Sequence, residues 1–199
     1  MDPRRIEREI RQCRLDKSSG VEIFIPEESN MLHLKASFPG PAATPYEGGK
    51  FVLNIELPND YPFKAPKVKF DTRVYHPNVS SQTGAICLDI LKDAWSPVLT
   101  LKTVVISIQS LLFDPVPDDP QDAEVANHYR SNRESFNAKA REWTRIYADP
   151  NTSLDMAGLD PGAITRLVEM GFGRKDVIGA LRKVNGNEEQ AVDALLNGL

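Results

Sequence analysis

At its centre the chain reads His76-Pro77-Asn78-Val79-Ser80-Ser81-Gln82-Thr83-Gly84-Ala85-Ile86-Cys87-Leu88. From here to about Val98 the residues follow neither the period of a helix nor that of a strand. A long irregular segment inside a domain is uncommon and is often functional. Its cysteine, Cys87, is far in sequence from the only other cysteine, Cys13, which argues against a disulfide or a shared metal site. Cys87 is therefore either a small buried hydrophobic residue or a residue placed for chemistry.

The composition excludes several classes of protein. The 199 residues are 41% hydrophobic and 26% charged, as in an ordinary globular protein of one or two domains. The net charge of −4 argues against nucleic acid as the main partner, because phosphate binding needs a basic surface. Two cysteines without C-x-x-C spacing predict a reducing compartment. No apolar run approaches membrane-spanning length, and the first residues lack the apolar stretch of a signal peptide. We expect a cytoplasmic or nuclear protein without a membrane partner, a metal or a cofactor.

The residues before the central segment predict a helix and then a sheet. Residues 4–16 carry an apolar stripe that includes Cys13, with Asp2 as N-cap and Pro3 as the first helical residue. Four runs then alternate apolar and polar residues, and their short connections favour an antiparallel meander. These runs are 21–25, 32–38, 51–57 and 67–70.

The residues after the central segment predict helices. Thr100 is the expected N-cap of a buried helix with apolar residues over 101–112. A second helix is expected over 121–130, and Ser131 with Glu134 is expected to form the capping box of a third. A helix, a sheet and then helices make an α+β domain.

A second, smaller domain is expected after residue 149. Residues 150–158 are polar, contain proline and glycine, and are predicted to be a linker. Residues 159–199 predict a small three-helix bundle, with Asn187 and Gln190 suited to a capping box. The three helices are expected at about 161–169, 174–184 and 188–197.

One reading of Cys87 is a protease nucleophile. Such a cysteine needs a histidine that takes the thiol proton, and His76 is the only histidine nearby. Pro77 follows this histidine directly, and no nucleophile elbow surrounds the cysteine. Hydrolysis is therefore disfavoured.

The other reading is an acyl carrier, in which the thiol holds an acyl group as a thioester and passes it to an amine. Asn78 offers a side-chain amide for the oxyanion. Asp89 and Asp119 are the candidate carboxylates that would orient an incoming lysine and accept charge from it. For each acidic residue the rival interpretation is a solvated or turn position.

Residues 1–149 resemble a ubiquitin-conjugating enzyme over the whole catalytic core. The blocks that carry the resemblance occur in the family's order and at its spacing. They are Pro45-Tyr46-Glu47-Gly48-Gly49, Tyr61-Pro62-Phe63, His76-Pro77-Asn78, Gly84-Ala85-Ile86-Cys87-Leu88, Trp95-Ser96-Pro97 and Pro117-Asp118-Asp119-Pro120.

The resemblance implies that Cys87 accepts ubiquitin from an activating enzyme as a thioester. It implies that Asn78 stabilises the oxyanion, with a structural loop role as the rival, and that Asp119 orients the acceptor lysine. Asp89 matches an acidic residue beside the thiol. His76 is assigned to bracing the loop, and Trp95 to packing.

The resemblance also implies a docking surface for partners. Arg4, Arg5 and Arg8 lie on the helix that binds the activating enzyme in this family. Phe63, Pro97 and Val98 match the two loops that engage RING- and HECT-type ligases. In some members a serine on the back face of the sheet binds ubiquitin non-covalently; Ile23 aligns with it, which argues against that mode.

Residues 159–199 resemble a ubiquitin-associated (UBA) domain. Gly171 supplies a tight turn in Met170-Gly171-Phe172, and Leu195-Leu196 follow near the end of the third helix. These five residues are the predicted ubiquitin-binding surface, and their rival role is to close a very small core.

The leading hypothesis is a ubiquitin-conjugating enzyme of the chain-building type, whose UBA domain holds ubiquitin. Its expected partners are ubiquitin, the activating enzyme, RING- or HECT-type ligases and protein substrates. A non-catalytic ubiquitin-binding adaptor on the same scaffold is the alternative. A third hypothesis is that the protein carries a different ubiquitin-like modifier, and the resemblance to a UBA domain argues against it.

Overall fold

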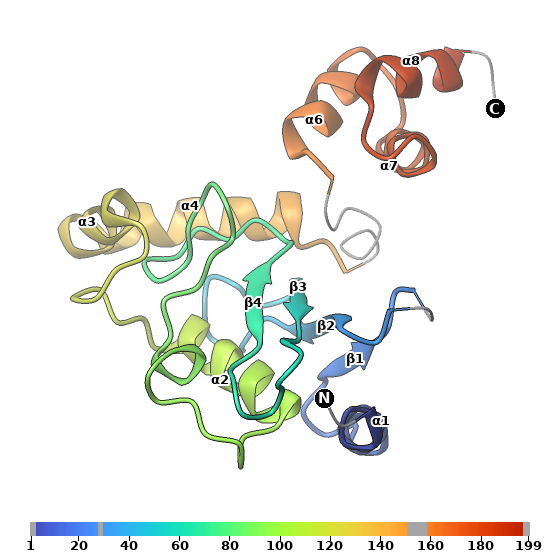
Figure 1. Ribbon diagram of the computed structural model, residues 1–199. Helices are drawn as coiled ribbons and strands as arrows, with labels where there is room; N and C mark the ends of the chain where they lie inside the picture. Colours follow the sequence, from blue (N-terminus) through green and yellow to red (C-terminus); the bar gives the residue numbers. More distant parts are fainter. Residues whose placement is uncertain (1–2, 28–29, 151–158, 197–199) are drawn as a thin grey trace. The chain divides into compact units, whose positions relative to one another are not determined.

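The computed structural model describes residues 3–27, 30–150 and 159–196. The chain divides at Asp149 into two units, which are considered separately (Figure 1). The expected N-cap Asp2 and most of the expected linker lie outside the described residues.

The first unit is built on a four-stranded antiparallel sheet in the order β1-β2-β3-β4. Each strand pairs antiparallel with the next one along the chain, so the sheet is a meander, although residues 40–49 and 57–66 form loops longer than the expected turns. Register places Phe38 opposite Phe51 and Ala36 opposite Leu53, so alternate residues of β2 and β3 build one apolar face. The strands are β1 (Glu22–Phe24), β2 (His33–Pro39), β3 (Lys50–Glu56) and β4 (Lys67–Phe70).

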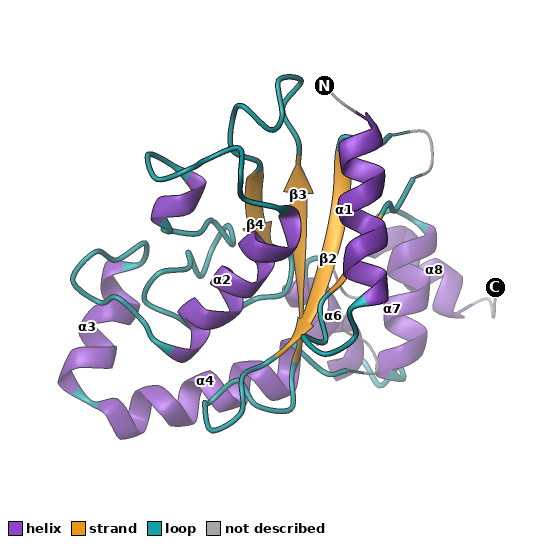
Figure 2. Cartoon of the chain, turned by 90° about the horizontal axis from the view of Figure 1, so that it is seen from below, coloured by secondary structure: helices purple, strands orange, loops and turns teal. Residues whose placement is uncertain are grey.

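Two helices cover this apolar face. Both α1 (Pro3–Leu15) and α2 (Leu101–Phe113) lie on one side of the sheet (Figures 1 and 2). The buried residues of α2 recur at the helical period and pack into the same core as β2 and β3. As expected, Thr100 is the N-cap of α2 and accepts from the N–H of Thr103. The antiparallel sheet with flanking helices confirms the α+β prediction.

The last two helices of this unit are α3 (Ala123–Ser131) and α4 (Arg133–Tyr147). The expected capping box at Ser131 was wrong by one residue. Ser131 is the last residue of α3, and Asn132 is the N-cap of α4, accepting from the N–H of Ser135 at 3.0 Å. Two helices meet here without a loop, so one residue ends the first helix and begins the second.

The second unit contains α6 (Pro161–Glu169), α7 (Arg174–Lys183) and α8 (Glu188–Leu196). Asp160 caps α6 by accepting from the N–H groups of Gly162 and Ala163. One half of the expected capping box of α8 is present, since the N–H of Gln190 donates to Asn187 Oδ1 at 3.0 Å. Among the described residues, no helix of either unit combines the length and apolarity needed to cross a membrane.

Candidate active site

Backbone pairing fixes the position of Cys87. Two isolated β-bridges hold the residues before it, Ala85 against Lys69 and Ile86 against Val79. The N–H of Cys87 itself donates to the carbonyl oxygen of Asn78 at 2.9 Å. The turn into this segment needs Gly84, whose φ is +72° and whose position would bring a Cβ to 2.1 Å from the Phe70 carbonyl oxygen. The irregular segment is therefore a tightly held loop.

The Cys87 thiol is half-buried and lies between two charged groups. Its Sγ is 3.5 Å from Asp119 Oδ2 and 3.4 Å from Lys92 Nζ. Both of these side chains are exposed. The site therefore combines an accessible sulfur with a carboxylate that could hold an ammonium group.

Sequence reasoning missed Lys92. The 3₁₀ turn η1 (Asp89–Leu91) follows the cysteine, and the N–H of Lys92 donates to the Asp89 carbonyl oxygen at 2.8 Å. This turn folds the lysine back toward the sulfur. The feature that could have identified Lys92 is its place five residues after Cys87. The sequence pattern did not predict the turn that brings the two side chains together.

The side chain of Asn78 holds the loop that carries Asp119. Its Nδ2 donates to the carbonyl oxygens of Val116 and Asp119 at 2.8 and 2.9 Å, and its Oδ1 accepts from the N–H of Val116 at 2.8 Å. Asn78 is only 1% exposed. Both amide hydrogens are engaged by the loop, so this geometry matches the structural interpretation of Asn78.

Asp89, the other predicted carboxylate, begins the turn η1. Its Oδ1 accepts from the N–H of Ile90 at 2.7 Å, and its side chain is exposed. Among the described residues, the carboxylate brought against Cys87 is that of Asp119. This turn contact accounts for an acidic residue at position 89 without a catalytic role.

His76 is fully buried and braces the floor of the site. Its Nε2–H donates to the Leu111 carbonyl oxygen at 2.9 Å, and its Nδ1 accepts from the N–H of Asn78 at 3.0 Å. Burial lowers the pKa of His76 to about 3. A neutral imidazole with both nitrogens occupied is not a base for Cys87.

Because an unfolded histidine titrates near 6.5, acid should destabilise the first unit. Below that pH, His76 in the unfolded chain binds a proton. His76 in the folded protein stays neutral until the pH reaches its lowered pKa. We expect the free energy of unfolding to fall by about 2 kcal/mol between roughly pH 6.5 and pH 5. The carboxylates with lowered pKa values, such as Glu22 and Asp122, lose their contribution at lower pH.

Denaturation followed by tryptophan fluorescence measures this effect, since both tryptophans lie in residues 1–149. His76→Gln should flatten the pH dependence, whereas His33→Gln should retain it. A free energy of unfolding that does not change over this pH range would contradict the prediction.

Most of the predicted docking residues are exposed, and Arg5 is half-buried. Phe63 and Val98 are 78% and 86% exposed, and Pro97 is exposed beside Val98. Arg4 and Arg8 are also exposed. Arg5 instead turns inward, with its Nε 2.7 Å from Glu9 Oε1. The exposed residues are those that a partner can reach.

Ile23 gives no information on ubiquitin binding at the back of the sheet. It pairs with Ala36 in the sheet and is 2% exposed, as part of the core between the sheet and the helices. The neighbouring Glu22 is exposed. Aligning Ile23 with a back-face position was therefore wrong, because alternation along β1 points its side chain to the other side.

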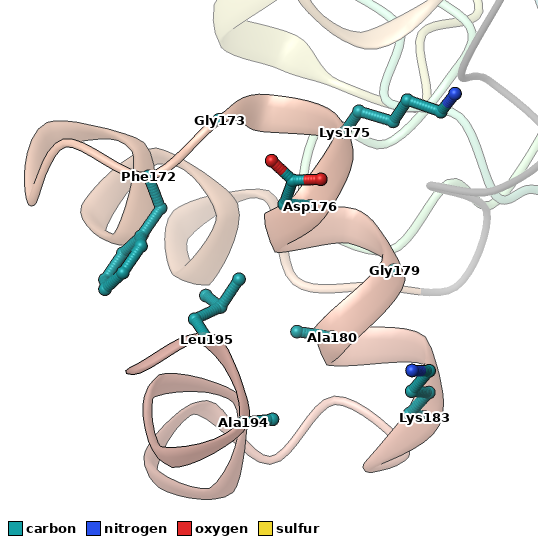
Figure 3. Close-up of a pocket in the computed structure, with 9 residues that line it drawn as sticks. All are labelled: Phe172, Gly173, Lys175, Asp176, Gly179, Ala180, Lys183, Ala194 and Leu195. Atoms are coloured by element: carbon teal, nitrogen blue, oxygen red, sulfur yellow. The ribbon is translucent and has the colours of Figure 1, made fainter. Parts of the chain in front are cut away.

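The second unit has its own apolar surface. Phe172, from the loop before α7, and Leu195, from α8, point toward the same space and line a cavity of about 450 Å³ (Figure 3). Met170 and Leu196 are exposed nearby in sequence. Gly171 has a φ of +99°, which allows the tight turn between Met170 and Phe172. The predicted ubiquitin-binding residues are thus accessible or line a cavity.

Comparisons with known proteins agree with this arrangement. The family model for ubiquitin-conjugating enzymes matches residues 5–144, and the model for UBA/TS-N domains matches residues 160–195. Ubiquitin-conjugating enzyme E2 1 of Schizosaccharomyces pombe is 46% identical over 98% of this chain and 93% of its own length. Ubiquitin-conjugating enzyme E2 K of Homo sapiens is 44% identical over 97% and 96%.

A solved structure shares the fold of the first unit. The E2 domain of a Toxoplasma gondii ubiquitin-conjugating enzyme superposes with a TM-score of 0.70 at 47% identity, covering 74% of this chain and 99% of that one. The sheet, its helices and the cysteine loop occur here in one chain with a separate helical unit. The chain therefore belongs to the ubiquitin-conjugating enzyme family, with a UBA domain following the conjugating domain.

Proposed function

We propose that Cys87 accepts ubiquitin from an activating enzyme and passes it to lysines of substrates or of ubiquitin. The observation that carries this proposal is the accessible Cys87 sulfur with Asp119 Oδ2 at 3.5 Å. In the first step the thiol attacks the ubiquitin thioester of the activating enzyme, and that enzyme's thiol leaves. In the second, an amine attacks the new thioester, so that a C–N bond forms, the C–S bond breaks and Cys87 regains its thiol.

Asp119 has the position needed for the second step. Its carboxylate can hold the incoming ammonium group beside the carbonyl carbon and accept charge as the amine loses its proton. Asn78 keeps this carboxylate in place through the loop contacts described above. The exposed Phe63, Pro97 and Val98 form the surface on which a RING- or HECT-type ligase and the activating enzyme dock.

Incubation with activating enzyme, ATP and ubiquitin tests this function. The expected product is an adduct of one ubiquitin that DTT removes. Failure to form a thioester, with ubiquitin binding retained, would instead favour a non-catalytic adaptor. A charging reaction in which ubiquitin competes with another ubiquitin-like protein shows which of the two Cys87 accepts.

We propose that the UBA domain binds ubiquitin or a growing chain and so keeps it at a high local concentration for transfer from the Cys87 thioester. Tethering raises the local concentration of the acceptor without changing the chemistry. Deleting residues 151–199 should therefore leave thioester formation unchanged and shorten the chains, as measured on gels over time. Met170→Arg should shorten chains in the same way, whereas Glu189→Arg, another exposed position, should not. Unaltered chain length in the deletion would contradict this role.

Lys92 offers the thioester a nearby amine. When no other acceptor is present, we expect ubiquitin to move slowly from Cys87 to Lys92 Nζ and to leave a DTT-resistant adduct. Peptide mass mapping should locate the adduct at Lys92. Lys92→Arg should remove this adduct while a DTT-sensitive one still forms, and Lys64→Arg should not affect it. An undiminished DTT-resistant adduct in Lys92→Arg would contradict the assignment.

A further inference from the structure

An ionic cluster around a buried carboxylate lies beneath the docking surface. It consists of Arg5 and Glu9 on α1 and Tyr61 on the loop between β3 and β4. Glu9 is 5% exposed, and its carboxylate accepts from Arg5 Nε at 2.7 Å and from the Tyr61 hydroxyl at 2.9 Å. It also accepts from the N–H of Leu101, the first residue of α2, at 2.8 Å. A buried carboxylate is costly unless it is paired, and three donors pair this one.

The same cluster reaches both segments that carry exposed docking residues. We name them the first docking loop, residues 57–66, and the second docking loop, residues 92–100. Arg5 Nη2 donates to the carbonyl oxygens of Pro97 and Leu99 in the second loop, at 2.6 and 3.1 Å. Tyr61 belongs to the first loop. One carboxylate thus connects α1, both docking loops and the start of α2.

A second contact ties the two loops directly. Trp95 Nε1 donates to the Pro62 carbonyl oxygen at 2.8 Å, and its ring lies 6.1 Å from that of Tyr61. Phe63 follows Pro62, and Val98 lies between the two carbonyl groups that Arg5 holds. The exposed side chains of Phe63 and Val98 therefore belong to backbone segments that are held in place by hydrogen bonds from Trp95 and from the cluster.

We propose that Glu9 is a positioning residue for partner docking, setting the spacing between Phe63 and Val98 through Arg5 and Tyr61. This inference rests on the proposed function of these two side chains as the ligase surface. Glu9 touches neither the ligase nor the reacting atoms. Its effect is to present the two loops in one arrangement, so that a ligase does not have to order them on binding.

The test is single-turnover discharge of the charged full-length protein to free lysine, at increasing concentrations of a RING domain that accelerates the wild type. Tyr61→Phe removes one donor to Glu9 and keeps the ring, and Glu9→Gln removes the charge. We expect both to raise the RING concentration for half-maximal rate by about fivefold or more, with the rate at saturation within about twofold. Tyr61→Phe keeps the test valid if Glu9→Gln does not fold.

Tyr46→Phe is the matched control. The hydroxyl of Tyr46 is also buried and donates to the Tyr75 carbonyl oxygen at 2.7 Å, but it lies outside the cluster. If Tyr61→Phe and Tyr46→Phe shift the RING dependence equally, or if Tyr61→Phe does not shift it, the positioning role is refuted. Phe63→Ala separates the two proposals. If Phe63→Ala does not change the RING dependence, the docking surface itself is misassigned.

Discussion

Cys87→Ala is expected to abolish the DTT-sensitive ubiquitin adduct completely. The variant lacks the sulfur that must attack the activating enzyme's thioester, and burial keeps the other cysteine, Cys13, inside the core. Cys87→Ser should give an adduct that resists DTT, because an oxygen ester replaces the thioester. Charging reactions run on gels with and without DTT measure both results.

Cys13→Ala is the matched control for Cys87→Ala. Cys13 lies on the buried face of α1, with its Sγ 3.4 Å from the Val21 carbonyl oxygen, so its loss affects stability rather than charging. We expect a normal DTT-sensitive adduct from this variant. An adduct that persists in Cys87→Ala would show that another group carries ubiquitin and would remove the basis of the proposed mechanism.

The second large effect is expected at Asn78. Asn78→Ala deletes three hydrogen bonds to the loop that carries Asp119, so that the carboxylate is no longer held beside the sulfur. We expect transfer of ubiquitin to free lysine to fall by roughly 100-fold, the scale of a misplaced catalytic group. Charging by the activating enzyme, which needs no acceptor lysine, should fall much less. Single-turnover rates of both steps measure the difference.

A double-mutant cycle separates the two interpretations of Asn78. If Asn78 acts by placing Asp119, then Asn78→Ala should add little to the defect of Asp119→Ala. If Asn78 instead stabilises the oxyanion, the two losses should multiply. Multiplied losses would therefore contradict the positioning role that the loop contacts indicate.

Much of the fold could be predicted because local patterns and long-range packing agree. The alternation over residues 51–57 and the apolar period after Thr100 describe surfaces that meet in one core, so tertiary contacts reinforce them. The cap of α4 was misplaced because Ser131 and Asn132 are both good N-cap residues. Only the end of α3 decides between them.

The sequence pointed to three residues that the structure brings together, but it gave neither Lys92 nor the contacts within the candidate site. Motif spacing pointed to Cys87, Asn78 and Asp119, whereas the direction of the Asn78 amide depends on carbonyl groups 38 and 41 residues away. Arg5 looks like an exposed docking residue on the surface of a helix. Its inward position depends on Tyr61 and Glu9, which sequence periodicity alone does not bring together.

The pairing of Arg5 with Glu9 also affects how quickly an acidic partner finds this face. A count of the arginines on α1 overstates the field outside the protein, because Glu9 neutralises the charge of Arg5 within the fold. Long-range attraction is then left to exposed residues such as Arg8. Added salt should slow association by less than the number of arginines suggests, since screening acts mainly on charges that face the solvent.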